Sequence, residues 1–302
     1  MASLVEEIQK LKKKRNAVIL AHYYVNDEVQ AIADYIGDSY YLAKVAVDLK
    51  EDTIVFAGVK FMGESAKILN PEKTVLMPDM NADCPMAHMA LVERIKEVRR
   101  EYDDVAVVCY INSTAELKMH SDICVTSANA MKIVKSLPNK NIFFIPDENL
   151  GRYIAGFVPE KKFIFNDGYC HVHKGITEEM VLKAKAAKPE AEVLIHPECT
   201  LDVLKHADYV GSTSGIIDYA TKSKSKDFLI STELGVLYML KQKNPDKNFY
   251  SVGPVQICPN MKKVTLEKIR DCLRDNTGVV EVSDEIRIKS LEPLQRMLTL
   301  AK

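Results

Sequence analysis

The chain has 302 residues, of which 47% are hydrophobic and 27% are charged, as expected for a globular protein with a large buried core. Its formal net charge is −1 and it has no basic or acidic tail, so its composition does not indicate binding to nucleic acid or anionic membranes. No apolar run is long enough to span a membrane, and residues 1–15 form an amphipathic Lys/Glu segment rather than a signal peptide. These features predict a cytoplasmic protein with neither a membrane nor a nucleic-acid partner.

Short β-rich runs alternate along the chain with amphipathic helical stretches, a pattern that predicts α/β architecture with parallel sheets. No Gly/Ser-rich linker separates these runs, so any domains must be tightly joined. In chain order, the predicted strands are Ala17–Ala21, Thr53–Ala57, Val105–Tyr110, Asn141–Ile145, Glu192–Ile195 and Phe228–Ser231.

Polar residues near the ends of these strands recur at a period of about 87 residues. His22, Tyr110 and His196 follow this period, at intervals of 88 and 86 residues. The repeat predicts three α/β units, at residues 1–100, 101–187 and 188–279, with a C-terminal helix at 280–302 that joins the first. The same period relates the segments Gly37-Asp38-Ser39, Thr126-Ser127-Ala128-Asn129 and Gly211-Ser212-Thr213, which precede helical patterns, and the strand ends near Gly58, Asp147 and Thr232.

Three of the seven cysteines share this period, because Cys84, Cys170 and Cys258 are separated by 86 and 88 residues. An odd number of cysteines without a secretory signal argues against a disulfide framework. Free cysteines are often core residues, and equal spacing can arise by chance. Chance is a weaker explanation here, because two other sets of polar residues share the period and each of the three cysteines lies in a loop context. The other cysteines, Cys109, Cys124, Cys199 and Cys272, occupy different repeat positions.

Equivalent thiols in three units predict a shared metal site. Ligands of open α/β sheets bind outside the carboxyl ends of the strands, so three such sheets around a pseudo-threefold axis would face one cavity. Three thiolates without a fourth protein ligand leave one coordination position open, as in catalytic metal sites. All-sulfur ligation suits zinc or an iron–sulfur cluster, and a [4Fe–4S] cluster held by three cysteines has one iron free to act on substrate as a Lewis acid.

The remaining repeated residues predict an anionic substrate. Hydroxyl residues where helices begin can bind phosphate or carboxylate together with backbone N–H groups, although plain helix capping explains any one of them. These residues are Ser39, Ser127, Ser212 and Thr213. His and Glu at strand ends are candidate acid–base groups, while Tyr and Asn there can orient carboxylates. The strand-end set is His22, Tyr24, Tyr110, Asn112, His196 and Glu198.

Two histidines lie beside Cys170 and have no counterparts beside the other two repeated cysteines. We expect His173 to lie in the pocket close to the metal, and His171 to face solvent or the outer shell of the site. Asp147 and Glu233 are equally well explained as helix caps or acidic first turns, so we place them outside the site.

A set of short stretches, in order along nearly the whole chain, carries a specific resemblance. They are Ile19–Tyr24, Gly37–Ser39, Gly58–Glu64, Cys84–Ala87, Tyr110–Glu116, Thr126–Ala130, Pro146–Gly151, Gly168–His173, His196–Cys199, Gly211–Thr213, Thr232–Gly235 and Cys258–Lys262. The chain resembles the quinolinate synthase family, the oxygen-sensitive [4Fe–4S] enzymes of NAD biosynthesis. The resemblance implies three pseudo-repeated three-layer αβα subdomains around a central cluster. It also implies condensation of iminoaspartate with dihydroxyacetone phosphate to quinolinate, with release of phosphate and water.

The resemblance also implies roles for individual residues. Cys84, Cys170 and Cys258 would hold one [4Fe–4S] cluster per chain, acting as a Lewis acid because the reaction involves no net redox change. Substrate-binding positions are matched by His22, Ser39, Tyr110, Asn112, Ser127, His196, Glu198, Ser212 and Thr213. Proton-transferring positions are matched by Tyr24, His196 and Glu198, with His173 close by. The implied partners are the two small-molecule substrates and, as a candidate protein partner, the enzyme that supplies iminoaspartate.

Three features depart from the family pattern. Many members have Asn where this chain has Tyr23, and His171 stands where Pro or another non-ligand is common. A C-terminal C-x-x-C-x-x-C motif, which can form a disulfide in some members, is absent, which puts redox switching by that route in doubt.

Two other functions remain open at this stage. The radical enzymes of diphthamide synthesis also use three cysteines from three related domains, but they act on a protein substrate with S-adenosylmethionine. The small-anion residues and the His196-Pro-Glu198 motif argue against that function. A non-catalytic protein with a three-thiolate zinc site is the alternative from a different class.

Overall fold

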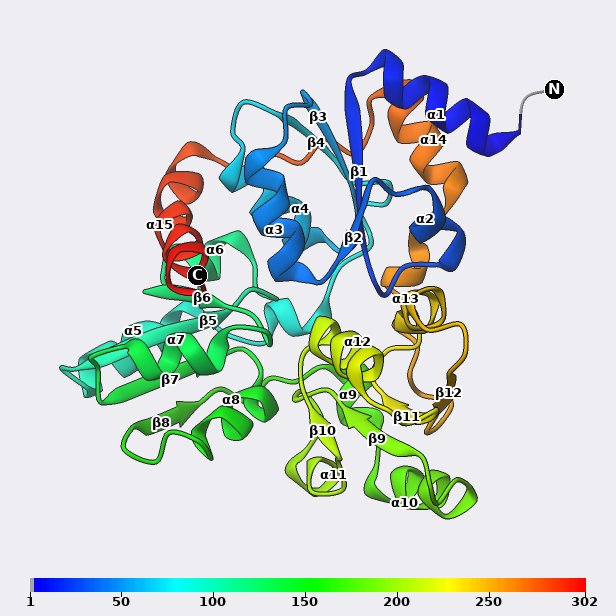
Figure 1. Cartoon of the computed structure of the whole chain (residues 1–302). Coiled ribbons are helices and arrows are strands. Elements are labelled where there is room, and N and C mark those ends of the chain that lie inside the picture. Colours follow the sequence, from blue (N-terminus) through cyan, green and yellow to red (C-terminus); the bar gives the residue numbers. More distant parts are fainter. Residues whose placement is uncertain (1–2) are drawn as a thin grey trace.

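Three four-stranded sheets make up the fold of residues 3–302, the part of the chain that the computed structural model describes (Figure 1). In each sheet the second strand along the chain pairs with the first, the first with the third, and the third with the fourth. All of these pairs are parallel. The predicted α/β architecture with three related units is therefore confirmed.

The two central strands of each sheet read as near-continuous apolar runs because helices flank the sheet and bury them. Every residue of β1, β3 and β5 is buried. The first sheet contains β1 (Ala17–His22), β2 (Tyr35–Gly37), β3 (Thr53–Ala57) and β4 (Thr74–Leu76); the second contains β5 (Val105–Tyr110), β6 (Ile123–Val125), β7 (Asn141–Ile145) and β8 (Lys162–Phe165); the third contains β9 (Glu192–Ile195), β10 (Tyr209–Val210), β11 (Asp227–Ser231) and β12 (Asn248–Ser251).

Helices follow almost every strand. None of the helices within residues 3–302 is both long and apolar enough to cross a membrane. The α-helices are α1 (Leu4–Lys14), α2 (Asp27–Ile32), α3 (Ser39–Asp48), α4 (Lys60–Leu69), α5 (Val92–Glu101), α6 (Ala115–Met119), α7 (Ala130–Ser136), α8 (Glu148–Ala155), α9 (His171–Gly175), α10 (Glu178–Ala187), α11 (Leu201–Leu204), α12 (Thr213–Lys222), α13 (Val236–Lys243), α14 (Leu266–Asp275) and α15 (Asp284–Leu300). Two 3₁₀ turns are η1 (Pro85–His88) and η2 (Met261–Lys263).

The six predicted strands are the central strands of the three sheets, and their observed bounds agree with prediction to within one residue. The edge strands were not predicted. These have two to four residues each, and several are half-exposed, so they give neither a long apolar run nor a clear alternation. β10, for example, consists of Tyr209 and Val210 alone.

The end of the chain packs across the units. Residues 278–280 run antiparallel to β4, where Met77 N–H donates to Gly278 O and Val280 N–H donates to Val75 O, both at 2.8 Å. α14 packs against α1 and β3, while α15 packs against α6, β6, α7 and α4 (Figure 1). Because both terminal helices contact elements outside the units assigned to them, the unit boundaries drawn from the sequence stay a prediction.

Gly278 is required where the chain returns to β4. Its φ is +72°, and a Cβ there would lie 2.1 Å from Met77 O. We expect Gly278→Ala to lower the free energy of unfolding by about 2 kcal/mol or more, because left-handed strain adds to a clash with backbone. Urea unfolding followed by circular dichroism measures the change.

Gly156→Ala is the matched control. Gly156 ends α8 with φ −60°, and its added Cβ would meet nothing closer than 3.4 Å. This substitution should change the free energy of unfolding by less than about 1 kcal/mol. Equal losses in the two variants would show that the return to β4 contributes nothing particular to stability.

Candidate active site

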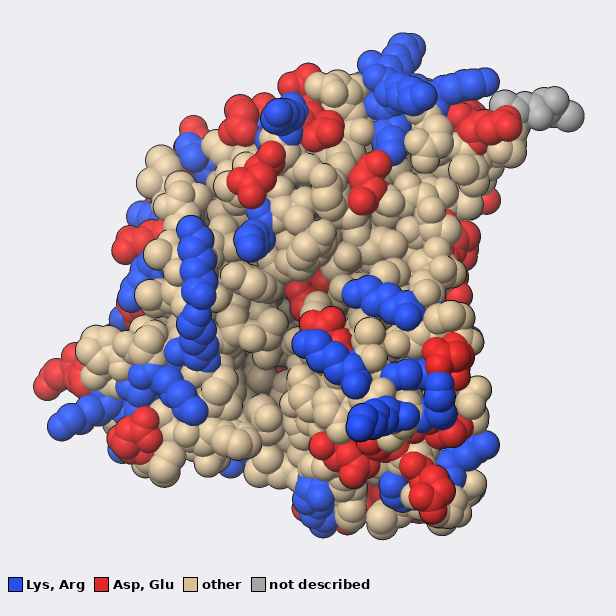
Figure 2. Space-filling model, in the orientation of Figure 1, with Lys and Arg blue, Asp and Glu red and all other residues tan. Residues whose placement is uncertain are grey.

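The first strands of the three sheets end at one central cavity. His22 ends β1, Tyr110 ends β5 and His196 follows β9, and all three side chains line the cavity. Its empty space amounts to about 740 Å³, part of it continuous with solvent. Figure 2 shows the surface recess near the centre of this face. The carboxyl ends of these strands therefore face one cavity, and ligands of open α/β sheets bind at such ends.

The cavity is lined by all of the predicted site residues except Ser212. Ser212 instead caps α12, where its hydroxyl accepts the Gly215 N–H at 3.1 Å. His171 also lines the cavity, and its side chain is exposed, as the sequence analysis expected. The predicted residues that the cavity brings together are His22, Tyr24, Ser39, Cys84, Tyr110, Asn112, Ser127, Cys170, His173, His196, Glu198, Thr213 and Cys258. Their chemical roles stay predictions.

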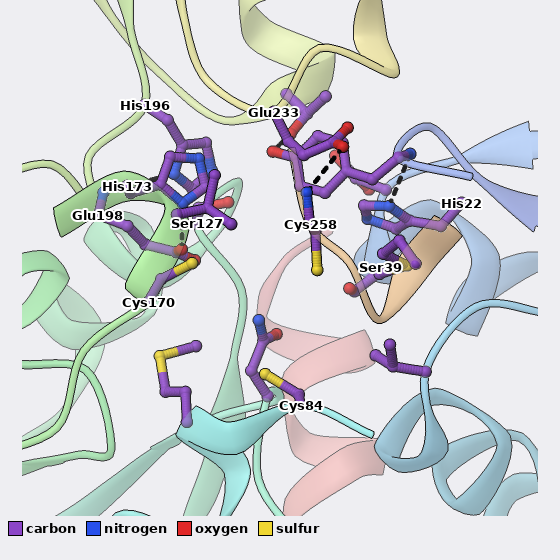
Figure 3. Close-up of a pocket in the computed structure, with 18 of the residues that line it drawn as sticks. His22, Ser39, Cys84, Ser127, Cys170, His173, His196, Glu198, Glu233 and Cys258 are labelled. Carbon is purple, nitrogen blue, oxygen red and sulfur yellow. Dashed lines mark hydrogen bonds and ion pairs between the residues drawn. The ribbon is translucent and has the colours of Figure 1, made fainter. Parts of the chain in front are cut away.

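Three cysteines direct their sulfur atoms into the cavity from three different loops (Figure 3). Cys84 follows β4, Cys170 follows β8 and Cys258 follows β12, and all three are free thiols. Burial raises the pKa of each, that of Cys84 to about 12. These thiols therefore ionise only when a cation replaces their protons. No other cysteine lines the cavity within the described chain, so the donors fit a metal centre with three sulfur ligands and one open position.

Two buried carboxylates hold the backbones of two of these cysteines. Asp147 Oδ2 accepts the Cys170 N–H at 3.1 Å, and Glu233 Oε1 accepts the Cys258 N–H at 3.1 Å. Our placement of both acids outside the site is wrong for Glu233, which lines the cavity. Asp147 does cap α8, because its Oδ1 accepts the Leu150 N–H at 2.7 Å. Its other oxygen, Oδ2, binds the Cys170 loop that folds back over it.

The first unit holds its cysteine differently. Val59 stands two residues after β3, at the repeat position of the two acids, and its side chain has no hydrogen-bond acceptor. The Cys84 N–H donates instead to Oδ1 of the neighbouring Asp83 at 2.8 Å. Asp83 is partly exposed and also contacts His88 Nε2 at 2.8 Å. Each cysteine N–H is thus bound by a carboxylate, but only two of the three carboxylates are fully buried.

His22 and His196 have the same local geometry in the first and third units. Nδ1 of His22 accepts the Tyr24 N–H at 3.1 Å, and Nδ1 of His196 accepts the Glu198 N–H at 3.4 Å. A neutral ring that accepts on Nδ1 carries its proton on Nε2. Burial lowers the pKa of both histidines to about 3, so both are neutral at neutral pH. Each therefore offers a neutral Nε2–H donor.

Glu198 is buried, and both of its oxygens have partners. The Tyr110 hydroxyl donates to Oε1, and His173 Nδ1 lies 2.7 Å from Oε2. Burial by itself would raise the pKa of Glu198, but the nearby histidines and the Tyr110 hydrogen bond hold it well below its ordinary value. Burial and the charge of Glu198 together raise the pKa values of Tyr110 and Tyr24 well above 10. Glu198 is accordingly ionised and the two tyrosines are protonated.

His173 lies beside the cysteine site, as predicted. Ligand atoms of Cys170, His173 and Glu198 all lie within 4.8 Å of one another, so this trio could itself hold a metal ion. Nε2 of His173 is already hydrogen-bonded with Thr232 Oγ1 at 2.8 Å, however, and Nδ1 lies 2.7 Å from Glu198 Oε2 without forming a hydrogen bond within the described residues. The ring also stacks on His196, with centroids 4.5 Å apart. These contacts favour a role in proton transfer over metal ligation.

The cavity also presents hydroxyl groups. Asp38 caps α3 by accepting the Tyr41 N–H at 2.9 Å, so Ser39 at the first helical position is not needed as the cap. The Ser39 and Ser127 hydroxyls make no hydrogen bond within residues 3–302. No Lys or Arg side chain lines the cavity in the described chain. An anion there would be bound by neutral donors and helix N-termini.

Several residues that line the cavity were not predicted. The buried Thr126 hydroxyl lines the cavity without a hydrogen-bond partner in the described chain, and only its place directly before Ser127 could have indicated it. An apolar wall was not predicted either, because such residues look like ordinary core in a sequence. This wall consists of Val59, Phe61, Met86, Val172 and Met261.

Glu233→Gln should weaken metal retention. Glu233 accepts the Cys258 N–H on one oxygen and the Gly235 N–H on the other, at 2.6 Å, whereas a glutamine has only one acceptor atom. We expect iron affinity to fall by about 10–100-fold, the usual effect of losing a partner that orients a ligand. Competition with an iron chelator measures this affinity.

Glu148→Gln provides the matched control. Glu148 lies beside Asp147 but is partly exposed and pairs with Arg152. The same chemical change there should leave iron affinity unaltered. Equal affinity in all three proteins would contradict the role assigned to Glu233.

The chain matches the family described as "Quinolinate synthetase A protein" over residues 6–299. It is 55% identical over 296 residues to the quinolinate synthase of Fusobacterium nucleatum, covering 98% of this chain and 99% of that protein. It is 52% identical over 299 residues to the quinolinate synthase of Clostridioides difficile, covering 99% and 98%. Quinolinate synthase 2 of Methanosarcina acetivorans is 48% identical over 298 residues, covering 99% and 96%. The chain therefore belongs to the quinolinate synthetase A family.

Proposed function

We propose that this protein is a quinolinate synthase of NAD biosynthesis, condensing iminoaspartate with dihydroxyacetone phosphate and releasing phosphate and water. The observation that carries the proposal is the convergence of three sulfur atoms and the Glu198–His173 pair on one cavity (Figure 3). The names of full-length relatives at 48% to 55% identity support the same activity. Such a reaction needs anion binding and several proton transfers, and it involves no net redox change.

The sulfur atoms of Cys84, Cys170 and Cys258 would hold one [4Fe–4S] cluster. When bound, the cluster supplies one iron without a protein ligand, which acts on substrate as a Lewis acid. The three-sulfur donor set supports this assignment, as does the absence of a fourth lining cysteine in the described residues. Met86 and Met261 in the apolar wall would limit water at the sulfur side of the cavity.

The substrates carry a phosphate and carboxylates, for which the cavity offers neutral donors. Ser39 at the start of α3 and Thr213 at the start of α12 would bind anionic oxygens together with helix N–H groups. His22 and His196 would donate their Nε2–H groups, and the Asn112 amide would orient a carboxylate. Because no Lys or Arg of residues 3–302 lines the cavity, a bound phosphate would be held mainly by hydrogen bonds.

Proton transfer is assigned to Tyr24, His173, His196 and Glu198. Glu198 stays ionised, and His173 Nδ1 lies 2.7 Å from its Oε2. Tyr24 remains protonated near neutral pH and can give or take a proton at its hydroxyl. His196 would act as a hydrogen-bond donor through its neutral Nε2–H group.

Iminoaspartate hydrolyses readily, so we propose that an enzyme producing it supplies this protein in the cytoplasm. A radical enzyme acting on a protein substrate is less well supported, because several groups lining the cavity suit small anions. A zinc-binding protein without catalysis would not need the buried Glu198–His173 pair, whose burial costs stability.

Metal content tests the cluster directly. Protein purified without oxygen should contain about four irons and four acid-labile sulfides per chain. Serine in place of Cys84, Cys170 or Cys258 should remove most of both. Cys109→Ser, in the fully buried β5, should retain them. Zinc without sulfide, or iron that is indifferent to the three substitutions, would count against the cluster.

The Glu198→Gln variant distinguishes a loss of catalysis from a loss of the cluster. The substitution removes the negative charge beside His173 and with it a proton acceptor in the cavity, so kcat for quinolinate formation should fall by about 10²–10⁴-fold. Iron and sulfide content should stay at the wild-type level. Tyr110→Phe, which removes one hydrogen bond and keeps the charge, should lower kcat less. Loss of the cluster from the Glu198 variant would contradict the role assigned here.

A further inference from the structure

Each cysteine loop is bound to its own sheet by the same backbone hydrogen bond. In every unit, the residue three positions after the third strand along the chain donates its N–H to the carbonyl oxygen two positions before the cysteine. The pairs are Lys60 N–H to Ala82 O at 2.8 Å, Glu148 N–H to Gly168 O at 2.8 Å and Leu234 N–H to Gln256 O at 2.9 Å. The backbone therefore places the three loops alike, and the differences between them come from side chains.

The third unit adds a side-chain amide to this bond. Gln256 is fully buried, and its Nε2 donates to Ile230 O and Thr232 O, each at 2.6 Å. Its Oε1 accepts the N–H groups of Val252 and Gly253, at 2.8 and 3.1 Å. The amide thus makes all four hydrogen bonds open to it, and it joins the carboxyl ends of β11 and β12 just before the cysteine.

The second unit obtains the same contact from a different position. Asn166 Nδ2 donates at 2.9 Å to Pro146 O, which directly follows β7 as Thr232 follows β11. Gly168 stands at the repeat position of Gln256 and leaves room for this amide. A Cβ on Gly168 would lie 2.9 Å from Asn166 Nδ2 and 2.3 Å from Pro146 O. The Asn166 side chain therefore fills the space that the glycine leaves.

Asn166 also contacts the cysteine loop of the first unit. Its Nδ2 donates at 3.1 Å to Met89 O, directly after the η1 turn that follows Cys84. Tyr169 N–H, next to Cys170, donates to Met89 Sδ at 3.4 Å. Because both partners of Asn166 are carbonyl oxygens, the nitrogen of its amide must face them. The buried Asn166 side chain therefore joins the Cys84 loop to the Cys170 loop.

The first unit has no amide of its own at this point. Ala82 occupies the repeat position of Gln256 and offers no side-chain donor. Its loop is held from the neighbouring units instead, by Asn166 of the second and by Lys263 of the third, whose Nζ donates to Asn81 O at 2.8 Å. The Lys263 contact is exposed, whereas Asn166 is 8% exposed. The placement of the first cysteine thus depends on a buried contact from another unit.

We propose that Asn166 is a positioning residue that holds the Cys84 and Cys170 loops at a fixed spacing before a metal centre binds, while Gln256 holds the Cys258 loop alone. This inference rests on the proposed function, in which the three cysteines hold one [4Fe–4S] cluster. A cluster that binds preformed loops does not have to order them, so its affinity is not reduced by that entropy cost. Two of the three sulfur ligands therefore depend on one asparagine.

The test compares the alkylation rates of individual cysteines in Asn166→Leu, Gln256→Met and the wild type. Leucine and methionine keep most of the side-chain volume and remove the amide. The full chain is freed of metal without oxygen and treated with N-ethylmaleimide, and each cysteine peptide is quantified by mass spectrometry. In Asn166→Leu, Cys84 and Cys170 should react about fivefold faster or more, because lost hydrogen bonds favour local opening. Cys258 should keep its wild-type rate, and Gln256→Met should show the reverse pattern.

Asn70→Leu is the matched control. Asn70 is also a buried asparagine, and its Nδ2 donates to Ala66 O at 3.0 Å at the end of α4, outside the three loops. This variant should keep all three alkylation rates within about twofold of wild type. Thermal unfolding is measured for every variant, because a generally destabilised protein exposes all three thiols together. Equal acceleration of the three thiols in Asn166→Leu, or a wild-type rate at Cys84, overturns the role assigned to Asn166.

Iron binding distinguishes failure of this inference from failure of the proposed function. In competition with an iron chelator, Asn166→Leu and Gln256→Met should each lose about 10–100-fold in iron affinity, and Asn70→Leu should lose none. Wild-type protein that binds no iron when purified without oxygen overturns the proposed cluster. Wild-type iron affinity in Asn166→Leu, in a protein that does bind iron, overturns the role of Asn166 alone.

Discussion

The buried negative charge of Glu198 is the constraint on which the polar arrangement of the cavity depends. Removing a carboxylate from water costs several kcal/mol unless partners compensate. Here the partners are the Tyr110 hydroxyl and His173, with no lysine or arginine lining the described cavity. An arginine would stabilise the charge but could not exchange a proton. A histidine can do both, so the same contact with Glu198 also places an ionisable ring beside the Cys170 thiol.

The threefold repeat explains why the groups converge, and the differences between repeats explain the chemistry. Parallel sheets with one strand order bring their carboxyl ends to one cavity and deliver one cysteine loop each. His22 and His196 keep the same Nδ1 geometry, whereas Tyr110 at the third equivalent position supplies the hydroxyl that donates to Glu198. The symmetry therefore builds the cavity, and one asymmetric residue supports its charged group.

The central strands, the equivalent thiols and most lining residues could be predicted because each depends on local pattern or on spacing along the chain. Other features depend on contacts between distant segments. Thr232 was visible as a repeated strand end, but its link to Tyr24, 208 residues away, has no local signal. Ser212 and Thr213 look equivalent in a sequence, and only the structure shows that the first caps α12 and the second faces the cavity. Glu233 was interpreted as a possible helix cap, because no neighbouring residue in the sequence indicates that the Cys258 loop folds back over it.

The position of Tyr24 is itself set by the contact between the first and third units. Gln30 Nε2 lies 2.9 Å from Tyr23 O and 3.0 Å from Gly235 O, and a Cβ on Gly235 would lie 2.6 Å from Tyr23 O. Lys262 donates to Tyr24 O at 2.7 Å. Tyr23 is buried among apolar residues of the third unit, so the tyrosine that departs from the family pattern adds apolar area to this contact. Because both partners of the Tyr24 hydroxyl belong to the third unit, that hydroxyl is held in place only when these two units are docked.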